Sequence, residues 1–397
     1  MTLITPQSAE AAILGNFPCA STESIPTDDA LGRTLRSTIH ADRAIPPFDR
    51  VMMDGIGIQL LDDSTPDSSY EIAGTQAAGA PPLTIEHPRF CFEVMTGAVA
   101  PTGVNCVIPI EALDIEETQG ARVAKIMAPS AVKIGNFIHP MGSDSNQGAA
   151  LVNAGCLLGI PELATAASNG AAQLEVSKLP VITLLTSGDE VIPIDHTPLA
   201  HQIRASHPIA IRSSIESNKL GTVKHQHLAD DPKLIEQSIR AALTSSDILI
   251  LTGGVSKGKF DFIAPVLREL CGPAKFHGIS QRPGKPFAYH SSPIPIFALP
   301  GNPLSVMACL ARYVLPALHQ HAKRTMETEH FMINGSVNGE FHLTQLLACK
   351  ISNGEAIPAS PKNSGEYTAI HGCTGIVEIP AHCGVIEKLN PVPFYPW

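Results

Sequence analysis

Several features that define whole classes of protein are missing from the sequence. None of the nine cysteines stands in a Cys-x-x-Cys pair, so we expect reduced, mostly buried thiols rather than a zinc site or a disulfide framework. No apolar run approaches the roughly 20 residues that span a membrane, and the N-terminus lacks the basic start of a signal peptide. The formal net charge is −10, which disfavours nonspecific nucleic-acid binding. We therefore expect a cytoplasmic protein with no nucleic acid and no membrane among its partners.

The first half of the chain changes texture twice. With 397 residues, 44% of them apolar, the chain is too long for one core and too apolar to be disordered. We predict helices over 7–16 and 28–42, and alanine-rich helical sequence returns after residue 142. A helical domain (1–43 plus 143–176) interrupted by a β-rich domain (44–142) is therefore expected. The predicted strands of the inserted domain are 70–73, 90–94, 106–109 and 122–126.

Strands and helices alternate over residues 177–323, which predicts a parallel sheet with helices on both faces. The final residues, 324–397, are short runs between glycines and prolines and predict a small β domain. The fold class is thus α/β and multidomain. The predicted strands of the α/β domain are 180–185, 222–228, 248–251 and 294–299, and its predicted helices are 204–219, 232–245 and one that begins at 261.

Polar motifs follow the predicted strands, at the sheet edge where open α/β folds bind ligands. Glycines in these motifs let the backbone approach a phosphate, and carboxylates beside phosphates usually hold Mg²⁺. Lysine and arginine would offset anionic charge. We therefore predict a site for a phosphorylated ligand and a divalent ion. The motifs are Ser187-Gly188-Asp189-Glu190, Asp230-Asp231, Gly253-Gly254-Val255-Ser256 with Lys257, Lys259 and Asp261, Arg282-Pro283-Gly284-Lys285, and Pro300-Gly301-Asn302-Pro303.

Each motif also has a structural interpretation. Glu190 could stand in a solvated turn, and Asp231 could cap the helix that Pro232 begins. Asn302 could cap the helix that follows it, and the cations could be surface charges. Asp54 of the inserted domain could belong to a plain Asp-Gly turn. The clustering of the motifs at one sheet edge favours a site.

In order and spacing, these motifs resemble those of the molybdopterin molybdenumtransferase (MoeA) family. The resemblance runs from about residue 5 and is weakest after 325. The residues that carry it are Phe48-Asp49, Met53-Asp54-Gly55, Met95-Thr96-Gly97-Ala98, Gly142-Ser143-Asp144, Ser187-Gly188-Asp189-Glu190, Gly253-Gly254-Val255-Ser256, Asp261, Phe276-His277-Gly278, Pro283-Gly284-Lys285-Pro286 and Leu299-Pro300-Gly301-Asn302-Pro303.

The resemblance implies a fold and an activity. The implied fold has an elongated helical domain with an inserted β domain, a three-layer α/β molybdopterin-binding domain and a C-terminal β barrel. The implied protein is a homodimer that inserts molybdate into adenylylated molybdopterin, with Mg²⁺-dependent release of AMP. A molybdopterin adenylyltransferase would supply the substrate.

The resemblance also assigns roles to residues. Glu190, Asp230 or Asp231, and Asp261 would hold Mg²⁺ or position water, and Lys285 and Arg282 would neutralise phosphate or molybdate oxygens. The backbone at Gly253, Gly254, Ser256, Pro300, Gly301, Asn302 and Pro303 would hold the pterin phosphate. Asp54 and Thr96 would complete the site from the other subunit, and Asp144 is a further candidate.

The chain departs from the family pattern at several positions. Val51-Met52 stands where the family has Ser-Ala, and His139, His207 and Lys259 stand where it usually has Arg, Asn and an acid. These changes leave open a second class of function, a molybdopterin carrier that has lost turnover. A scaffold protein is the third alternative.

Overall fold

The computed structural model describes residues 3–61, 65–118, 120–127, 129, 132–254, 262–339, 341–386 and 391–397. The chain forms two compact units. The larger unit contains Met1–Ser37, Ala154–Leu163 and Gln173–Trp397, and the smaller unit contains Thr38–Asn153 and Ala164–Ala172. The smaller unit is therefore an insertion, as predicted, although the division into four domains stays a prediction.

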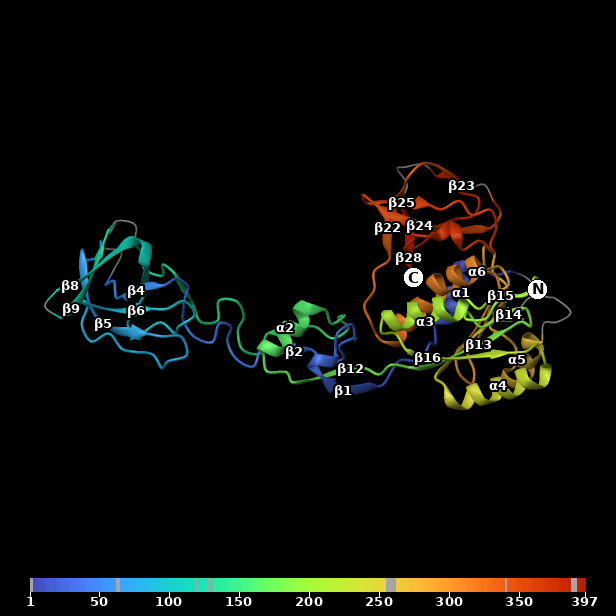
Figure 1. Ribbon diagram of the computed structural model, residues 1–397, viewed down its shortest axis with the longest axis horizontal. Helices are drawn as coiled ribbons and strands as arrows, with labels where there is room; N and C mark the ends of the chain where they lie inside the picture. Colours follow the sequence, from blue (N-terminus) through green and yellow to red (C-terminus); the bar gives the residue numbers. More distant parts are fainter. Residues whose placement is uncertain are drawn as a thin grey trace. The chain divides into compact units, whose positions relative to one another are not determined.

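A six-stranded sheet forms the centre of the larger unit (Figure 1). Its first four strands are parallel and its last two are antiparallel. Each of the four predicted strands is present. The central strands β17 and β21 are buried along their whole length, as expected of apolar runs covered on both faces. The order is β16 (Thr222–Leu228), β13 (Val181–Ser187), β17 (Ile248–Thr252), β21 (Ile296–Leu299), β20 (Ala288–His290) and β18 (Phe276–His277).

Helices cover both faces of this sheet and make a three-layer α/β arrangement (Figure 1). Alternate residues of β17 show why: Ile248 and Ile250 belong to one hydrophobic core and Leu249 and Leu251 to the other. Each such buried side chain contributes about 1.5–3 kcal/mol to folding. One face is covered by α1 (Pro6–Leu14), α3 (His207–Ser217), α6 (Pro303–Cys309) and α7 (Leu315–His321), and the other by α4 (Pro232–Ser245) and α5 (Ile263–Cys271).

The C-terminal strands close into a five-stranded barrel, which confirms the expected β barrel. Closure results from pairing of β24 with β26, so that no strand of the ring is left as an edge. A short strand of the α/β domain, β19 (Gln281–Arg282), adds to β24 in parallel. The ring is β24 (Thr344–Ser352), β25 (Glu355–Pro358), β22 (Glu329–Ile333), β28 (Pro391–Pro396) and β26 (Gly375–Ile379), with β23 (Val337–Gly339), β27 (Gly384–Ile386) and η5 (Thr368–Ile370) beside it.

The smaller unit is built on a six-stranded sheet, and the four strands predicted there are all present. Two short strand pairs complete the unit. The sheet order is β7 (Cys106–Pro109), β4 (Gly55–Ile58), β6 (Phe90–Val94), β5 (Ser69–Gln76), β9 (Ala121–Ile126) and β8 (Leu113–Thr118), with η2 (Ile110–Ala112), and the pairs are β3 (Arg50–Val51) with β10 (Ile138–His139) and β2 (Ile39–His40) with β11 (Ala150–Val152).

The predicted helix over 28–42 is wrong. A single 3₁₀ turn, η1 (Thr27–Asp29), precedes Gly32, whose φ of 75° is incompatible with a right-handed helix. Leu35 is then fully buried in extended backbone and bridges to Val176. Residues 143–176 likewise contain only one helix, α2 (Ile160–Ser168).

Two short strand pairs are also present in the larger unit, one of them in the segments that were expected to form a helical domain. They are β1 (Thr22–Pro26) with β12 (Gln173–Ser177), and, in the α/β domain, β14 (Val191–Ile192) with β15 (Ile203–Arg204). The predicted helix from 261 is present as α5 from Ile263, and residue 261 itself lies outside the described residues.

A buried ion cluster ties the α/β domain to the barrel. Arg312 is 2% exposed and lies on η4 (Leu310–Val314), a π-helical turn between α6 and α7. Its Nε donates to Glu378 of β26 at 2.6 Å, and its Nη2 donates to Glu10 of α1 at 2.8 Å. Burial disfavours the charged guanidinium, but the hydrogen bond to Glu10 and the charge of Glu378 outweigh it and raise the pKa of Arg312. The ring of Tyr395 lies 4.5 Å from the guanidinium carbon.

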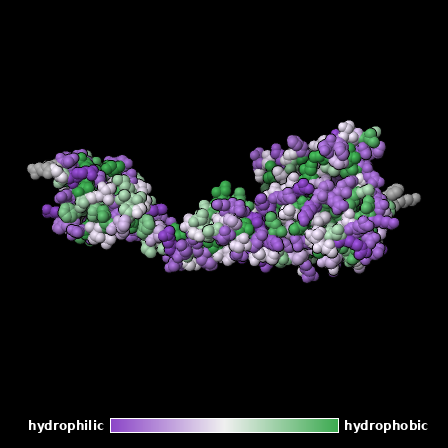
Figure 2. Space-filling model, turned by 60° about the horizontal axis from the view of Figure 1, so that its bottom comes forward, coloured by the Kyte–Doolittle hydropathy of each residue, from purple (hydrophilic) through white to green (hydrophobic). Residues whose placement is uncertain are grey.

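On the face of the larger unit shown in Figure 2, hydrophilic and hydrophobic residues are interspersed. Apolar atoms normally make up much of a folded surface, so this pattern needs no special explanation. In the described ranges we find no helix whose length and hydropathy would suit a bilayer.

We predict that Glu378→Gln lowers the free energy of unfolding by about 3–5 kcal/mol, because it leaves a buried guanidinium without its closest counter-charge. Trp397, the only tryptophan in the sequence, packs against the adjoining core, so its fluorescence during urea unfolding is the measurement.

The matched control is Glu236→Gln, which removes an exposed i,i+4 pair with Arg240. Its expected cost is about 0.5 kcal/mol or less. Equal costs for the two variants would contradict the role given to Glu378.

Candidate functional site

Three strands of the parallel sheet end side by side and bring their motifs together. Thr186 of β13 is in register with Thr252 of β17, and Thr252 with Leu299 of β21. The residues that follow are Ser187, Gly253 and Pro300, so the predicted convergence of motifs at one edge is present.

Backbones approach so closely at this edge that glycine is required. Gly253 has a φ of 86°, and a Cβ there would lie 2.8 Å from the carbonyl oxygen of Ser187. Gly254 follows with a φ of 58°, and a Cβ on Gly301 would lie 3.6 Å from the Gly253 Cα, in ordinary van der Waals contact. The result is a tight glycine turn packed against Ser187 and the side chain of Ile263, and the N–H groups of such glycine turns can bind a phosphate.

Three carboxylates neighbour one another beside the glycines. The Asp189 Oδ1 accepts a hydrogen bond from the Asp230 N–H at 3.1 Å. The Glu190 carboxylate lies over Gly188, 2.8 Å from the position a Cβ would occupy. Burial raises the pKa of Asp230, and the charges of Asp189 and Glu190 raise it further. A cation or a proton is therefore favoured at this point.

Asp231 has a structural use. Its Oδ1 accepts from the N–H groups of Lys233 and Leu234, at 2.8 and 3.1 Å, and caps α4. The capping interpretation is confirmed, and a metal role for Asp231 stays a prediction.

Part of the predicted site falls outside the described residues, namely Ser256, Lys257, Lys259 and Asp261. Within the described ranges no three His, Cys, Asp or Glu side chains are arranged to hold a metal ion. The carboxylates near Asp230 are thus close enough to influence one another without forming a closed cage.

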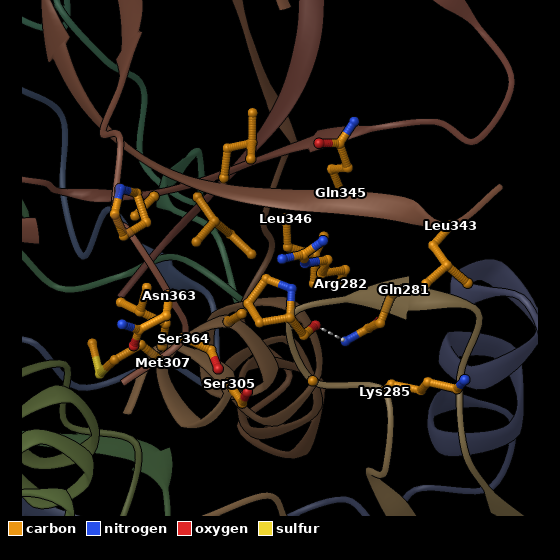
Figure 3. A pocket seen from close by; sticks show the side chains of 18 of the residues that line it. Gln281, Arg282, Lys285, Ser305, Met307, Leu343, Gln345, Leu346, Asn363 and Ser364 are labelled. Atoms are coloured by element: carbon orange, nitrogen blue, oxygen red, sulfur yellow. Dashed lines mark hydrogen bonds between the residues drawn. The ribbon is translucent and has the colours of Figure 1, made fainter. Parts of the chain in front are cut away.

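The predicted cations line a cavity of about 620 Å³ between the α/β domain and the barrel (Figure 3). Arg282 and Lys285 are both exposed side chains of its wall. Further polar groups come from α6 and from the barrel, namely Ser305, Gln345, Lys362, Asn363 and Ser364. The cavity therefore gathers three cations with hydroxyl and amide groups, a set that suits a tetrahedral oxyanion or a phosphate.

Hydrogen bonds of Gln281, which is fully buried, hold the turn that carries Arg282 and Lys285. Gln281 Nε2 donates to the carbonyl of Pro283 at 3.1 Å (dashed in Figure 3), and its Oε1 accepts from the Tyr313 hydroxyl. Gly284, with a φ of 93°, leaves room for Cys309, whose Sγ would lie 2.6 Å from a Cβ. The turn is thus fixed by α6 and η4.

Asn302 connects the strand ends with the cavity. It occupies the N-cap position of α6, but its side chain makes no capping bond. Instead its Nδ2 donates to the Oγ of Ser364 at 3.1 Å, and the Ser364 carbonyl accepts from the Leu304 N–H at 3.0 Å. Asn302 therefore stands at the predicted capping position, but its side chain does not cap the helix.

Sequence reasoning missed the barrel's contribution. Lys362, Asn363 and Ser364 stand in a turn-rich run that was interpreted only as a loop of a small β domain. The available signal was a lysine, an amide and a hydroxyl in succession after Pro361. Ser305 was also missed, although it follows the Pro300–Pro303 motif by two residues.

The smaller unit brings Asp54 and Thr96 together. The Asp54 Oδ1 accepts from both the N–H and the hydroxyl of Thr96, each at 2.7 Å. The backbone bond and then the side-chain bond lower the pKa of Asp54. Gly55 is no plain turn residue, since it begins β4 and a Cβ there would meet the Ile108 carbonyl at 1.9 Å.

Two of the departures from the family pattern have structural partners. His139 Nε2 lies 2.8 Å from the Asp144 Oδ1, and its Nδ1 lies 3.2 Å from Nη2 of Arg50. His207 begins α3 and meets the ring of Tyr367 edge-on, and burial lowers its pKa. Each histidine thus packs locally as a polar or aromatic partner.

Comparison with known proteins agrees with this geometry. Two family models match: the MoeA N-terminal region (domain I and II) over residues 4–170, and the probable molybdopterin binding domain over 183–320. A molybdopterin molybdenumtransferase of Synechocystis sp. is 33% identical over 403 residues, with 100% of both chains covered. One of Haemophilus influenzae is 26% identical, with 85% of this chain and 82% of the relative covered.

A solved structure shows the same fold. The molybdopterin biosynthesis moeA protein of Pyrococcus horikoshii matches with a TM-score of 0.82 at 22% identity, with 100% of both chains covered. The chain therefore belongs to the molybdopterin molybdenumtransferase (MoeA) family of molybdenum cofactor biosynthesis.

Proposed function

We propose that the protein inserts molybdenum from molybdate into adenylylated molybdopterin and releases AMP. The proposal rests mainly on one observation: two groups of candidate residues, one at the strand ends of the α/β domain and one in the cavity beside the barrel, lie next to each other. Glycine backbone and carboxylates lie at the strand ends, and cations line the adjoining cavity, with the Asn302–Ser364 hydrogen bond between them.

The cations and the backbone have separate tasks in this proposal. The backbone at Gly253, Gly254 and Gly301 holds a phosphate, because glycines at the strand ends let the N–H groups of the chain approach an anion closely. Arg282 and Lys285 neutralise phosphate or molybdate oxygens, and the hydroxyls of Ser305 and Ser364 can donate to the same oxygens.

The carboxylates fit a magnesium ion that is shared with the substrate. Mg²⁺ is usually held by one or two carboxylates, waters and substrate phosphates rather than by a full protein cage. Glu190 and Asp230 meet that description, and Asp261 is a further candidate outside the described residues. When bound, the ion would neutralise charge on the adenylyl phosphate. Asp230, whose pKa is raised, would ionise fully once a cation is near.

The proposed protein is a homodimer, in which Asp54 and Thr96 of one subunit complete the site of the other. The support is the exposed Asp54–Thr96 pair, which is already held together by hydrogen bonds. All the residues that we assign to phosphate binding belong to the larger unit, so this pair needs a site elsewhere. A molybdopterin adenylyltransferase is the proposed donor of the substrate.

The direct test is incubation with adenylylated molybdopterin, molybdate and Mg²⁺, followed by measurement of AMP. We expect release that EDTA abolishes. Tight molybdopterin binding without AMP release at any Mg²⁺ concentration would support the carrier function instead.

We predict that Arg282→Gln slows AMP release on the order of 10²-fold, because it removes a charged group from the oxyanion-binding wall. Lys224→Gln is the matched control, an exposed lysine on the edge strand β16. A similar loss in both variants would show that overall charge, rather than the cavity, is responsible.

We predict that Glu190→Gln and Asp231→Ala affect different properties. Glu190→Gln should slow AMP release on the order of 10²-fold with unchanged thermal stability. Asp231→Ala should lower the free energy of unfolding by about 1 kcal/mol through the lost cap of α4, with AMP release unchanged. If Asp231→Ala loses activity at a temperature where it is folded, that result would support a metal-binding role for Asp231.

We predict that two inactive variants restore activity when their subunits are mixed. Asp54→Ala and Arg282→Gln damage different halves of a site that two subunits share, so mixed dimers hold one intact site. Random mixing should give about a quarter of the wild-type AMP release. Activity that stays at the level of the single variants, in mixtures shown to contain mixed dimers, would contradict a shared site.

A further inference from the structure

A second cavity, of about 350 Å³, lies between α5 and the antiparallel edge of the α/β sheet. No residue of its lining belongs to the strand-end motifs or to the first cavity. Small side chains create it: Ala288 of β20 is in register with Ala298 of β21, and Ala264 of α5 faces the same space. Helix and sheet therefore leave a hollow where larger residues would have packed.

Basic side chains surround this hollow. Arg268 of α5 and Lys275 are exposed at its rim, and His277 and His290 line it further in. No carboxylate belongs to the lining, and in the described part of the chain neither Arg268 nor Lys275 forms an ion pair. Arg268 alone would be explained by the helix C-terminus it stands in. Two unpaired cations with two histidines, in a chain of net charge −10, need a further reason.

His290 supplies a second observation. It is 5% exposed, and its Nδ1 is buried without a hydrogen-bond partner. Burial and the neighbouring His277 lower its pKa, and a hydrogen bond to the backbone of Gly272 opposes that shift. The neutral ring therefore donates to the Gly272 carbonyl through Nε2 and keeps an unused acceptor at Nδ1. Buried polar atoms without partners are rare and call for an explanation.

The arrangement has a polarity that selects a ligand class. Cations stand at the rim, much of the lining is apolar, with Leu267 and the alanines, and the polar ring of His290 lies in the wall. The volume exceeds that of a single inorganic ion and is in the range of small-molecule sites. A ligand with a doubly charged head and a compact, hydroxyl-bearing body matches all three features.

We propose that this cavity binds a small phosphomonoester, such as a sugar phosphate or a nucleoside monophosphate. The phosphate pairs with Arg268 and Lys275 at the rim, and the body lies in the hollow against the apolar lining and the His290 ring. This site is separate from the proposed catalytic site and does not depend on the reaction assigned to it.

The test uses the full-length protein, with ribose 5-phosphate as the probe and the histidine ring signals in NMR spectra as the readout. His290→Gln identifies the His290 signal. We expect that signal to shift saturably with ribose 5-phosphate, and ribose, which lacks the phosphate, to leave it unmoved. Absence of a saturable shift would overturn the proposal.

Charge variants locate the binding event. The double variant Arg268→Gln/Lys275→Gln should raise the apparent Kd at least about tenfold, since two charge-assisted contacts are lost. Lys224→Gln and Arg282→Gln/Lys285→Gln should leave it unchanged, because their residues lie outside this cavity. An unchanged Kd in the first double variant, or a shift that disappears with Arg282→Gln/Lys285→Gln, would show that the ligand binds elsewhere.

Discussion

The position of the barrel on the α/β domain depends on Arg312, a guanidinium that is almost completely withdrawn from water. Its partners come from α1 and from β26, so a single side chain joins the start, the middle and the end of the larger unit. Such a cluster adds little net stability, because desolvation offsets most of the attraction. It does penalise any arrangement that leaves one member unpaired. The cavity next to it, with walls from α6, β19 and β24, follows from that fixed arrangement.

The candidate site has two parts of opposite charge, the strand ends with their carboxylates and the cavity with its cations. At the strand ends, Gly253 and Gly301 remove side chains so that backbone can approach an anion, and acids gather beside them. In the cavity, Arg282 and Lys285 present cations on a turn that buried Gln281 holds in place. The phosphorylated substrate of the proposed function would use both, because its oxygens require counter-charge while a metal ion requires carboxylates.

Local sequence pattern predicted where the strands lie, but it did not predict which distant segments pack or pair with them. Continuous apolar runs such as 248–251 predicted buried strands because both of their faces meet a core. The helix assigned to 28–42 failed because Gly32 and Leu35 obey a tertiary constraint, the pairing with β12 and its neighbours, that local sequence does not reveal. The site was predicted where motifs are contiguous, as at 253–254 and 300–303. Lys362 and Ser364 were not predicted as site residues, because only the closure of the barrel brings their segment to α6.

Net charge, finally, is a poor guide to what this protein binds. The chain carries −10, yet each of the two cavities has lysine and arginine and no aspartate or glutamate in its lining. Within such hollows the field of a few unpaired cations exceeds that of distant surface acids, which water and salt screen over about 8–10 Å. The acidic balance therefore disfavours extended polyanions such as nucleic acids, whereas a small anion that fits inside is attracted. The acids Asp189, Glu190 and Asp230 gather instead at the strand ends, where the proposed function gives them a divalent ion to hold. What such a surface attracts thus depends on where the charges lie, and the packing of the barrel against α6 sets that placement for the first cavity.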